Sequence, residues 1–288
     1  MLGGDSGQQC RRPDRAWADG RDRVDADPGR GAPSNQIPVN IQRASGNAIE
    51  RQNTIGISQF LHRNLAGVTV NAAQENTFQP DVSFRGFTAS PLLGTPQGLA
   101  VYVDGVRVNE PFGDVVNWDL ILANAIQSID LLPGSNPVFG LNNLGGALVI
   151  TMKNGFDDPG ITASGYTGSF DRDAAEAQFG AHGGGIGYFL AANALNEDGW
   201  RDHSPSRLRQ LMMRTDLRPN PTTRLNLSYT GARRTGRCSS RWIICSTAIT
   251  RLWACSVRTP SPDRGARSMR LARCRHSSAR QARRAASG

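Results

Sequence analysis

The segment after Gly155 consists of short stretches in which apolar and polar residues alternate. In one of them, Leu211, Met213, Thr215 and Leu217 alternate with Gln210, Met212, Arg214 and Asp216. The other stretches are Ile161–Phe170, 175–181, Ile186–Asn196 and 224–229, and turn residues such as Asp171–Asp173 and Pro219–Thr222 separate them. Alternation with period two predicts strands with one apolar and one polar face. This pattern fits a transmembrane barrel wall, but periodicity alone favours an ordinary soluble sheet, because barrel strands give a weak signal.

Residues 35–155 mix helical and strand patterns. The spacing of apolar residues predicts a helix over Thr54–Asn64, with Thr54 as its N-cap, and a short helix over Trp118–Ala125. Leu99–Val103 and Val106–Val108 flank Asp104-Gly105, a pair that predicts a tight hairpin because both turn positions need positive φ. Further strands are expected at Val68–Asn71, Asp81–Arg85, Ile126–Leu132 and Ala147–Met152. The longest apolar run has about five residues, whereas a transmembrane helix needs roughly 18–20.

The formal net charge of +9 comes from one end of the chain. Residues 1–34 hold six Arg and six Asp, residues 35–231 have a net charge of −4, and residues 232–288 hold 14 Arg and one acid. Four of the five cysteines also lie in this last segment, at Cys238, Cys245, Cys255 and Cys274, and the fifth is Cys10. Their spacing lacks the paired ligands of a zinc site, so we expect no metal site.

Neither end of the chain shows a sequence pattern typical of a folded domain. The head, 1–34, has few bulky apolar residues and no signal-peptide pattern, which makes export doubtful. The tail, 232–288, has no period of 2 or 3.6, and Arg233-Arg234 and Arg283-Arg284 are compatible with a nucleic-acid-binding arm. The chain has 32 Arg but one Lys, Lys153, which is typical of GC-rich coding DNA. We therefore hypothesise that the tail is an out-of-frame product and that the head arises similarly.

A series of motifs over 81–154 resembles the plug domain of TonB-dependent outer-membrane receptors. The series runs Ser83-Phe84-Arg85-Gly86-Phe87, Val101-Tyr102-Val103-Asp104-Gly105-Val106, Ile126 to Gly134, Val138-Phe139-Gly140, and Leu144-Gly145-Gly146 to Thr151 and Lys153. Asp130 stands where the family usually has Glu, and Pro133 precedes Gly134. The resemblance implies an α+β plug domain at 35–155, followed at 156–231 by the first antiparallel strands of an incomplete transmembrane β-barrel. The ends are expected to be disordered or irregular.

The resemblance also implies a function. Such receptors bind a scarce small molecule or metal chelate, for instance a ferric siderophore or a vitamin B12-like ligand, and receive energy from the TonB complex. No covalent chemistry or cofactor is expected, and the implied location is the cell outer membrane. By position in the family, the connections 88–98 and 109–114 are the apical plug loops, with Gln97, Asn109 and Phe112 as candidate ligand contacts. Arg85, Gly86, Asp104, Gly105, Gly134, Gly140, Gly145 and Gly146 are expected to be structural, and Arg85 and Asp104 are candidates for ion pairs with the wall.

The chain departs from the family pattern in having no clear TonB box and only about five barrel strands. We therefore expect a truncated receptor that does not transport as it stands. Two alternatives remain: a soluble ligand-binding plug, and a nucleic-acid-binding protein that depends on the tail. An enzyme is not expected, because the sequence has no G-x-S-x-G, H-E-x-x-H or phosphate-loop motif, and His62, His182, His203 and His276 lie in unrelated contexts.

Overall fold

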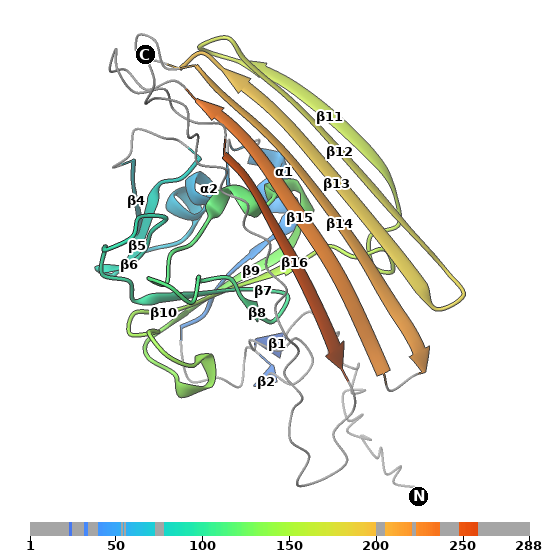
Figure 1. The fold of residues 1–288 in the computed structure, drawn as a ribbon, viewed down its shortest axis with the longest axis horizontal. Helices are drawn as coiled ribbons and strands as arrows, with labels where there is room; N and C mark the ends of the chain where they lie inside the picture. The colour runs from blue at the N-terminus through green and yellow to red at the C-terminus, as the bar shows by residue number, and fades with distance from the viewer. Residues whose placement is uncertain are drawn as a thin grey trace, which may run out of the picture.

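The computed structural model describes residues 40–52, 54, 56–72, 78–199, 205–220 and 223–236, and by their backbone 23–24, 32–33 and 248–258. An α+β unit is followed by a long antiparallel sheet, here called the wall sheet (Figure 1). The unit contains β3 (Gln42–Ser45), α1 (Gly46–Gln52), α2 (Ile57–Asn64), β4 (Val68–Asn71), β5 (Asp81–Phe84), β6 (Phe87–Ala89), β7 (Leu99–Val103), β8 (Val106–Arg107), β9 (Ile126–Pro133) and β10 (Gly146–Met152). Two further strands, β1 (Arg23–Val24) and β2 (Ala32–Pro33), pair with each other.

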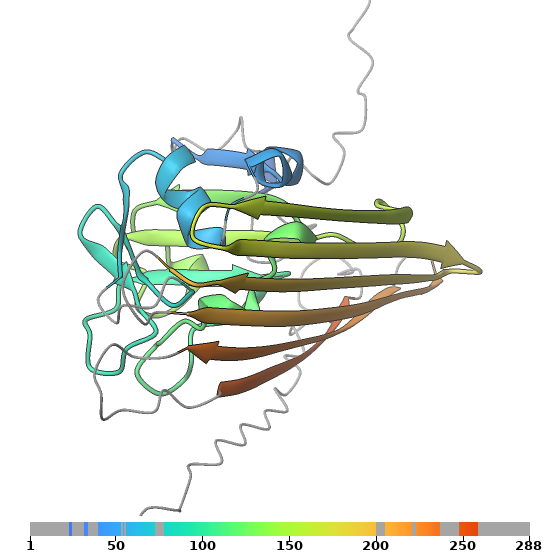
Figure 2. The ribbon, with the colours of Figure 1, turned by 90° about the horizontal axis from the view of Figure 1, so that it is seen from above.

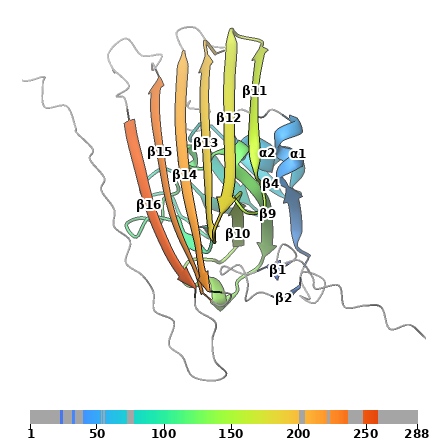
Figure 3. The ribbon, with the colours of Figure 1, turned by 90° about the vertical axis from the view of Figure 1, so that its right-hand side faces the viewer.

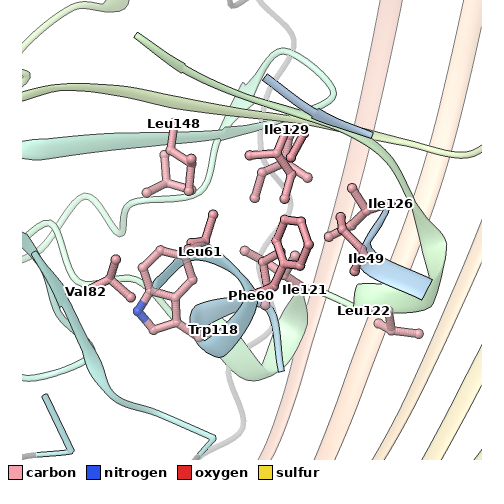
Figure 4. Packing of buried hydrophobic residues seen from close by; sticks show 14 of the residues in the cluster. Ile49, Phe60, Leu61, Val82, Trp118, Ile121, Leu122, Ile126, Ile129 and Leu148 are labelled. Carbon is pink, nitrogen blue, oxygen red and sulfur yellow. The ribbon is translucent and has the colours of Figure 1, made fainter. Parts of the chain in front are cut away.

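The unit is built on a five-stranded sheet with the order β3-β9-β10-β7-β8. β10 runs parallel to β7 and antiparallel to β9, and a second sheet holds β4, β5 and β6. The two helices and the 3₁₀ turns η3 (Trp118–Leu120) and η4 (Ala123–Ala125) cover an apolar core (Figure 4). Its fully buried members include Phe60, Leu61, Ile126, Ile129 and Leu148. Burial of this apolar surface is the main term that favours the fold of the unit.

The helices differ in detail from the sequence prediction. α2 begins at Ile57, with Gly56 at the N-cap position, so the prediction of Thr54 as the cap was wrong. Thr54 is buried, and its hydroxyl has no hydrogen-bond partner among the residues that the structure describes. The predicted helix over Trp118–Ala125 is two 3₁₀ turns, and α1 was not predicted. The amphipathic pattern located α2, whereas its start depends on the local backbone.

The hairpin predicted at Asp104-Gly105 is present. Val103 pairs with Val106, and Asp104 and Gly105 have φ values of 49° and 79°. Positive φ at both central positions is the requirement of a type I′ turn, which the Asp-Gly pair meets with little strain. Asp104 is thereby placed at the tip of the β7–β8 hairpin, where its side chain is available to elements outside the hairpin.

The wall sheet consists of six strands in chain order, which lie side by side (Figure 3). They are β11 (Gly160–Gly168), β12 (Arg172–Gly183), β13 (Ile186–Glu197), β14 (Ser206–Asn220), β15 (Thr223–Gly236) and β16 (Ala248–Arg258). The sheet extends past residue 231, where the sequence pattern predicted the start of the tail. Backbone pairing with the free edge of β15 explains β16, because edge groups accept any strand whatever its side-chain pattern. The proposed origin of the tail stays a hypothesis.

The two faces of the wall sheet differ in polarity. On the face that points away from the α+β unit, Phe179, Leu190, Met213 and Tyr229 are register neighbours across four strands. Exposed Tyr188, Leu211 and Leu227 lie on the same face. The face toward the unit mixes apolar residues with buried polar ones, among them Asn193, Gln210, Arg214 and Asp216. Apolar outside and polar inside is the pattern of a transmembrane barrel wall. No helix in the described part of the chain is long and apolar enough to cross a membrane.

Two strands of the unit approach too closely at Gly146 for a side chain. Gly146 begins β10 with φ 145°, and a Cβ atom there would lie 2.2 Å from the carbonyl oxygen of Leu132 on β9. Both the backbone conformation and the contact therefore require glycine.

We predict that Gly146→Ala destabilises the chain by about 2 kcal/mol or more. The substitution strains the backbone at Gly146, and it also forces the neighbouring strand to move. Gly86→Ala is the matched control, since Gly86 also has positive φ but a Cβ atom there would meet nothing within 4 Å. Urea unfolding of both variants measures the difference. Equal losses of free energy of unfolding would show that the contact with Leu132 does not matter.

Candidate functional site

A buried arginine joins the wall sheet to the α+β unit. Arg214 of β14 donates from Nε and Nη2 to the two carboxylate oxygens of Asp216, two residues along the same strand, at 2.8 and 3.1 Å. Its Nη1 reaches the hairpin tip, at 2.8 Å from Asp104 Oδ2, and the carbonyl oxygen of Met152 at 3.2 Å. The other oxygen of Asp104 accepts from the backbone N–H of Met152 at 3.0 Å. We call this group the Arg214 junction.

Electrostatics explain why the Arg214 junction is paired so completely. Burial raises the pKa of Asp104, and the guanidinium of Arg214 opposes this by stabilising the carboxylate. A buried charge is costly unless its partners satisfy it, and Arg214 has two carboxylates and a carbonyl oxygen. The ion pair considered for Asp104 in the sequence is therefore present. Arg85 instead stacks on the ring of Phe84, 5.1 Å from its centroid.

A second polar contact joins α1 to the wall sheet. Glu50 of α1 forms an ion pair with Lys153, which follows β10, and accepts from Gln178 Nε2 of β12 at 2.9 Å. Lys153 also donates to Gln178 Oε1 at 2.8 Å. Burial acts to raise the pKa of Glu50, but hydrogen bonds from Lys153 and Gln178 outweigh it, and the pKa is lowered. Glu176 is the other carboxylate near this group.

The connection from β10 to the wall sheet packs against the tight turns of that sheet. Arg218 stacks over the ring of Phe156 at 3.7 Å, and His182 Nδ1 lies 3.1 Å from the carbonyl oxygen of Gly155. β12 and β13 are joined here by Gly184-Gly185, and two residues separate β14 from β15. At the opposite end the connections have three residues between β11 and β12, eight between β13 and β14 and eleven between β15 and β16. We call these the tight-turn end and the long-loop end.

The loops predicted to contact a ligand lie away from the tight-turn end. β10 runs toward that end and is parallel to β7, so the start of β7 and the loop 88–98 before it lie at the far side. The loop 109–114 lies at the same side, because the chain after β8 runs back along β7. Val108 donates its N–H to the carbonyl oxygen of Val101. In Figure 2 the loops of the unit lie on the left, on the same side as the arrowhead of β15. The arrowhead of β12 lies on the right.

Gln97 and Asn109 brace these two loops internally. The side chain of Gln97 accepts from the N–H of Ser90 at 2.8 Å and donates to the carbonyl oxygen of Ser90 at 3.3 Å. Asn109 is buried, accepts from the N–H of Val101 at 2.7 Å and donates to the carbonyl oxygens of Leu99 and Asp114, each at 3.2 Å. Their amides therefore order the loops, while a ligand contact by either side chain stays a prediction.

Phe112 is the predicted contact residue that the loops expose. Phe112 is 79% accessible, and Leu93 on the neighbouring loop is 61% accessible. The two loops touch each other: a Cβ at Gly113 would lie 2.6 Å from Leu93 Cδ2. The pair of loops thus presents an apolar surface on a braced framework. We call 88–98 and 109–114 the loop surface.

The remaining motif residues occupy turns and close approaches. Gly86, Gly105, Gly134 and Gly140 have positive φ, and a Cβ at Gly145 would lie 2.4 Å from Phe87 Cβ. Within the described residues, no group of three His, Cys, Asp or Glu side chains is placed to hold a metal ion.

Sequence reasoning missed the wall partners of the unit. Arg214, Asp216 and Gln178 were read only as polar positions of alternating strands. The available signal was Arg-x-Asp within one strand, because residues two apart share a face and an Arg–Asp pair on the inner face marks a buried contact. Leu93 was missed because Leu92-Leu93, two adjacent leucines in a loop, show no helical or strand period.

The comparisons with known proteins agree with this architecture. The family model described as TonB-dependent Receptor Plug Domain matches residues 33–147. The ferric-catecholate import receptor Fiu from E. coli K12, in its closed form, superposes with a TM-score of 0.59 at 18% identity, over 75% of this chain and 29% of that one. The alcaligin outer-membrane receptor FauA from Bordetella pertussis gives 0.58 at 16%, over 82% and 38%. FpvA from P. aeruginosa gives 0.57 at 15%, over 80% and 33%.

These results define a plug domain seated against part of a barrel wall. The chain carries the plug domain of the TonB-dependent receptors, and the recognition made from its motifs is confirmed. At these identities the solved structures establish the fold alone. The chain spans about three-tenths to two-fifths of the length of those receptors.

We predict that Arg214→Met destabilises the chain by about 3–5 kcal/mol, because Asp104 and Asp216 are left buried without their cation. Asp104→Asn should cost less, since its amide oxygen still accepts from the N–H of Met152. Denaturant unfolding of the single variants and of Arg214→Met combined with Asp104→Asn gives the coupling energy. Additive single losses would show that Arg214 and Asp104 do not interact.

We predict that the Glu50 contact weakens in acid. Its folded-state pKa lies below the unfolded value near 4.5, so its contribution is complete above that pH and is lost as the pH falls through the folded pKa. The Glu50→Gln variant should therefore lose the part of the acid dependence that is due to Glu50. The measurement is the free energy of unfolding of the original chain and of Glu50→Gln from pH 7 to about pH 3. Glu176 also titrates in this range, and it does so in both proteins. Parallel pH profiles would exclude a role for Glu50.

Proposed function

We propose that this chain is part of an outer-membrane receptor that takes up a scarce metal chelate, with the chelate bound at the loop surface. The observation that carries the proposal is the seating of a TonB-dependent receptor plug domain on the wall face that holds buried polar residues, while the other face carries a band of exposed apolar ones. In such an arrangement the plug blocks the interior of the barrel, and one end of the plug meets ligand.

The structural neighbours support the class of ligand. Fiu is described as a ferric-catecholate import receptor, FauA as an alcaligin receptor, and FpvA in complexes with ferric pyoverdines. We infer from these neighbours that the ligand of this chain is also a ferric siderophore or a chelate of similar size. The partner that supplies energy would be the TonB complex, as in the family.

The connections of the wall sheet support an orientation in the membrane. Barrels of the outer membrane have short turns on the periplasmic side and longer loops outside. The tight-turn end would therefore face the periplasm and the long-loop end the exterior. The loop surface then faces the direction from which a nutrient arrives, and the Arg214 junction and the Glu50 contact lie below it.

Transport requires a closed barrel, which has more strands than the described wall sheet. The described wall sheet has six strands, and closed single-chain barrels need at least about eight. We propose that uptake belongs to a longer receptor and that this chain supplies the plug and one side of its wall.

We predict that Phe112→Ser lowers the affinity of the full chain for its ferric chelate by about tenfold, because burying a phenylalanine side chain contributes about 1.5–3 kcal/mol. Val138→Ser is the matched control, since Val138 is also exposed on the plug, at 67%, but lies outside the loop surface. The measurement is isothermal titration of the chain in detergent with a panel of ferric siderophores. Binding that both variants retain unchanged would contradict a ligand site at Phe112.

A further inference from the structure

The loop surface offers no cation to a ligand. The segment 88–98 contains no charged residue, and 109–114 contains only two, Glu110 and Asp114. Recognition of a polyanionic chelate in proteins depends on Arg or Lys side chains that pair with its charge. These two loops provide none from their own sequence.

The two carboxylates of the loop surface are already engaged. Glu110 accepts a hydrogen bond from Asn117 Nδ2 at 2.7 Å. Asp114 pairs with Arg107 Nη2 at 3.0 Å and accepts from Asn142 Nδ2 at 2.8 Å. The guanidinium of Arg107 is thereby used within the plug. The surface is left without a cation that is free to meet a ligand.

Three arginines of the wall that face the plug are paired with carboxylates. Arg172 of β12 forms an ion pair with Glu197 of β13 at 2.8 Å, and Arg234 of β15 lies 3.8 Å from Asp119 Oδ2. Arg214 is held in its junction. Within the described part of the wall, carboxylates of the protein itself offset the positive charge of these three arginines. The inner face of the wall therefore adds little positive potential beside the loops.

What the loop surface does offer is apolar area. Phe112 and Leu93 project from touching loops, and the loops are held in shape by the amides of Gln97 and Asn109. Exposed apolar side chains on a braced framework that holds carboxylates but no cation favour a partner with little negative charge and an apolar exterior, because an anionic partner would lose its hydration without gaining a cation.

We infer that the plug of this chain selects an uncharged ferric chelate with an apolar exterior, of the trihydroxamate type, and disfavours a trianionic triscatecholate. This inference rests on the proposed function, since it specifies the ligand of the same surface. It sets the chain apart from Fiu, which is described as a receptor for ferric catecholates. The fold is shared between them, whereas the charge of the loop surface decides the ligand.

The experiment titrates the full chain in detergent with two probes of opposite character: ferrichrome, an uncharged trihydroxamate chelate, and ferric enterobactin, a trianionic triscatecholate. Ferrichrome should bind at least about tenfold more tightly, with an affinity that is insensitive to salt between roughly 0.05 and 0.5 M. Tighter binding of ferric enterobactin would overturn the inference on charge while leaving chelate binding, and thus the proposed function, intact. Binding of neither probe nor of any other chelate in the panel would overturn both.

A charge introduced at the surface provides the second test. Phe112→Lys should raise the affinity for ferric enterobactin by at least about fivefold and lower that for ferrichrome, because the new ammonium attracts the trianion. Val138→Lys adds the same charge elsewhere on the plug and should change neither affinity more than twofold or so. Equal effects of the two variants would show that the loop surface does not contact the chelate.

Discussion

The buried guanidinium of Arg214 is the interaction on which the arrangement of plug and wall depends. Arg214 stays charged at any pH a cell meets, so once it is buried it must be surrounded by acceptors. Asp216 supplies two from its own strand, and Asp104 and the carbonyl oxygen of Met152 supply the rest from the plug. The wall therefore cannot satisfy its own arginine fully, and the plug completes it. Such a contact contributes little net stability compared with an apolar one, but it permits few alternative positions, because a small shift leaves a buried charge without a partner.

The position of this contact in the fold separates two roles of the plug. The Arg214 junction and the Glu50 contact both attach to the end of β10, one through Met152 and the other through Lys153. β10 is also the strand that continues into the wall sheet. The plug is thus attached where its last strand leaves it, and a third ion pair, between Asp119 of the plug and Arg234 of β15, lies nearer the long-loop end.

The sequence predicted the elements well where one residue or one period decides the structure. Asp104-Gly105 specified its hairpin because few other pairs accept two positive φ values, and the alternation from Gln210 to Leu217 specified a strand and its two faces. The start of α2 was wrong because the chain enters the helix through Gly56 in an extended conformation, which no capping pattern announces. The partners of the plug were missed for a different reason. Asp104 and Arg214 are 110 residues apart, and alternation states which face a residue occupies but not what lies opposite. Candidate contacts such as Asn109 were placed by family position, which locates a loop but does not distinguish a side chain that braces it from one that it displays.

Fold and ligand are determined by different parts of this chain. Receptors that share 15–18% of their residues with it superpose on it, so the plug and wall architecture tolerates nearly complete replacement of side chains. The features that such replacement must keep are backbone ones, for example the close approach at Gly146, and a few buried charges with their partners. In the loop surface such constraints fall on Gly94, Gly113 and Asp114, which have positive φ, and on the amides that brace the loops, rather than on the exposed Phe112 and Leu93. Its exposed positions are therefore free to vary with the ligand, and their chemistry, rather than the fold, is the part of the molecule from which the ligand must be inferred. Phe112 and Leu93 lie on loops that hold two carboxylates and no cation, and they make the exposed part of that surface apolar.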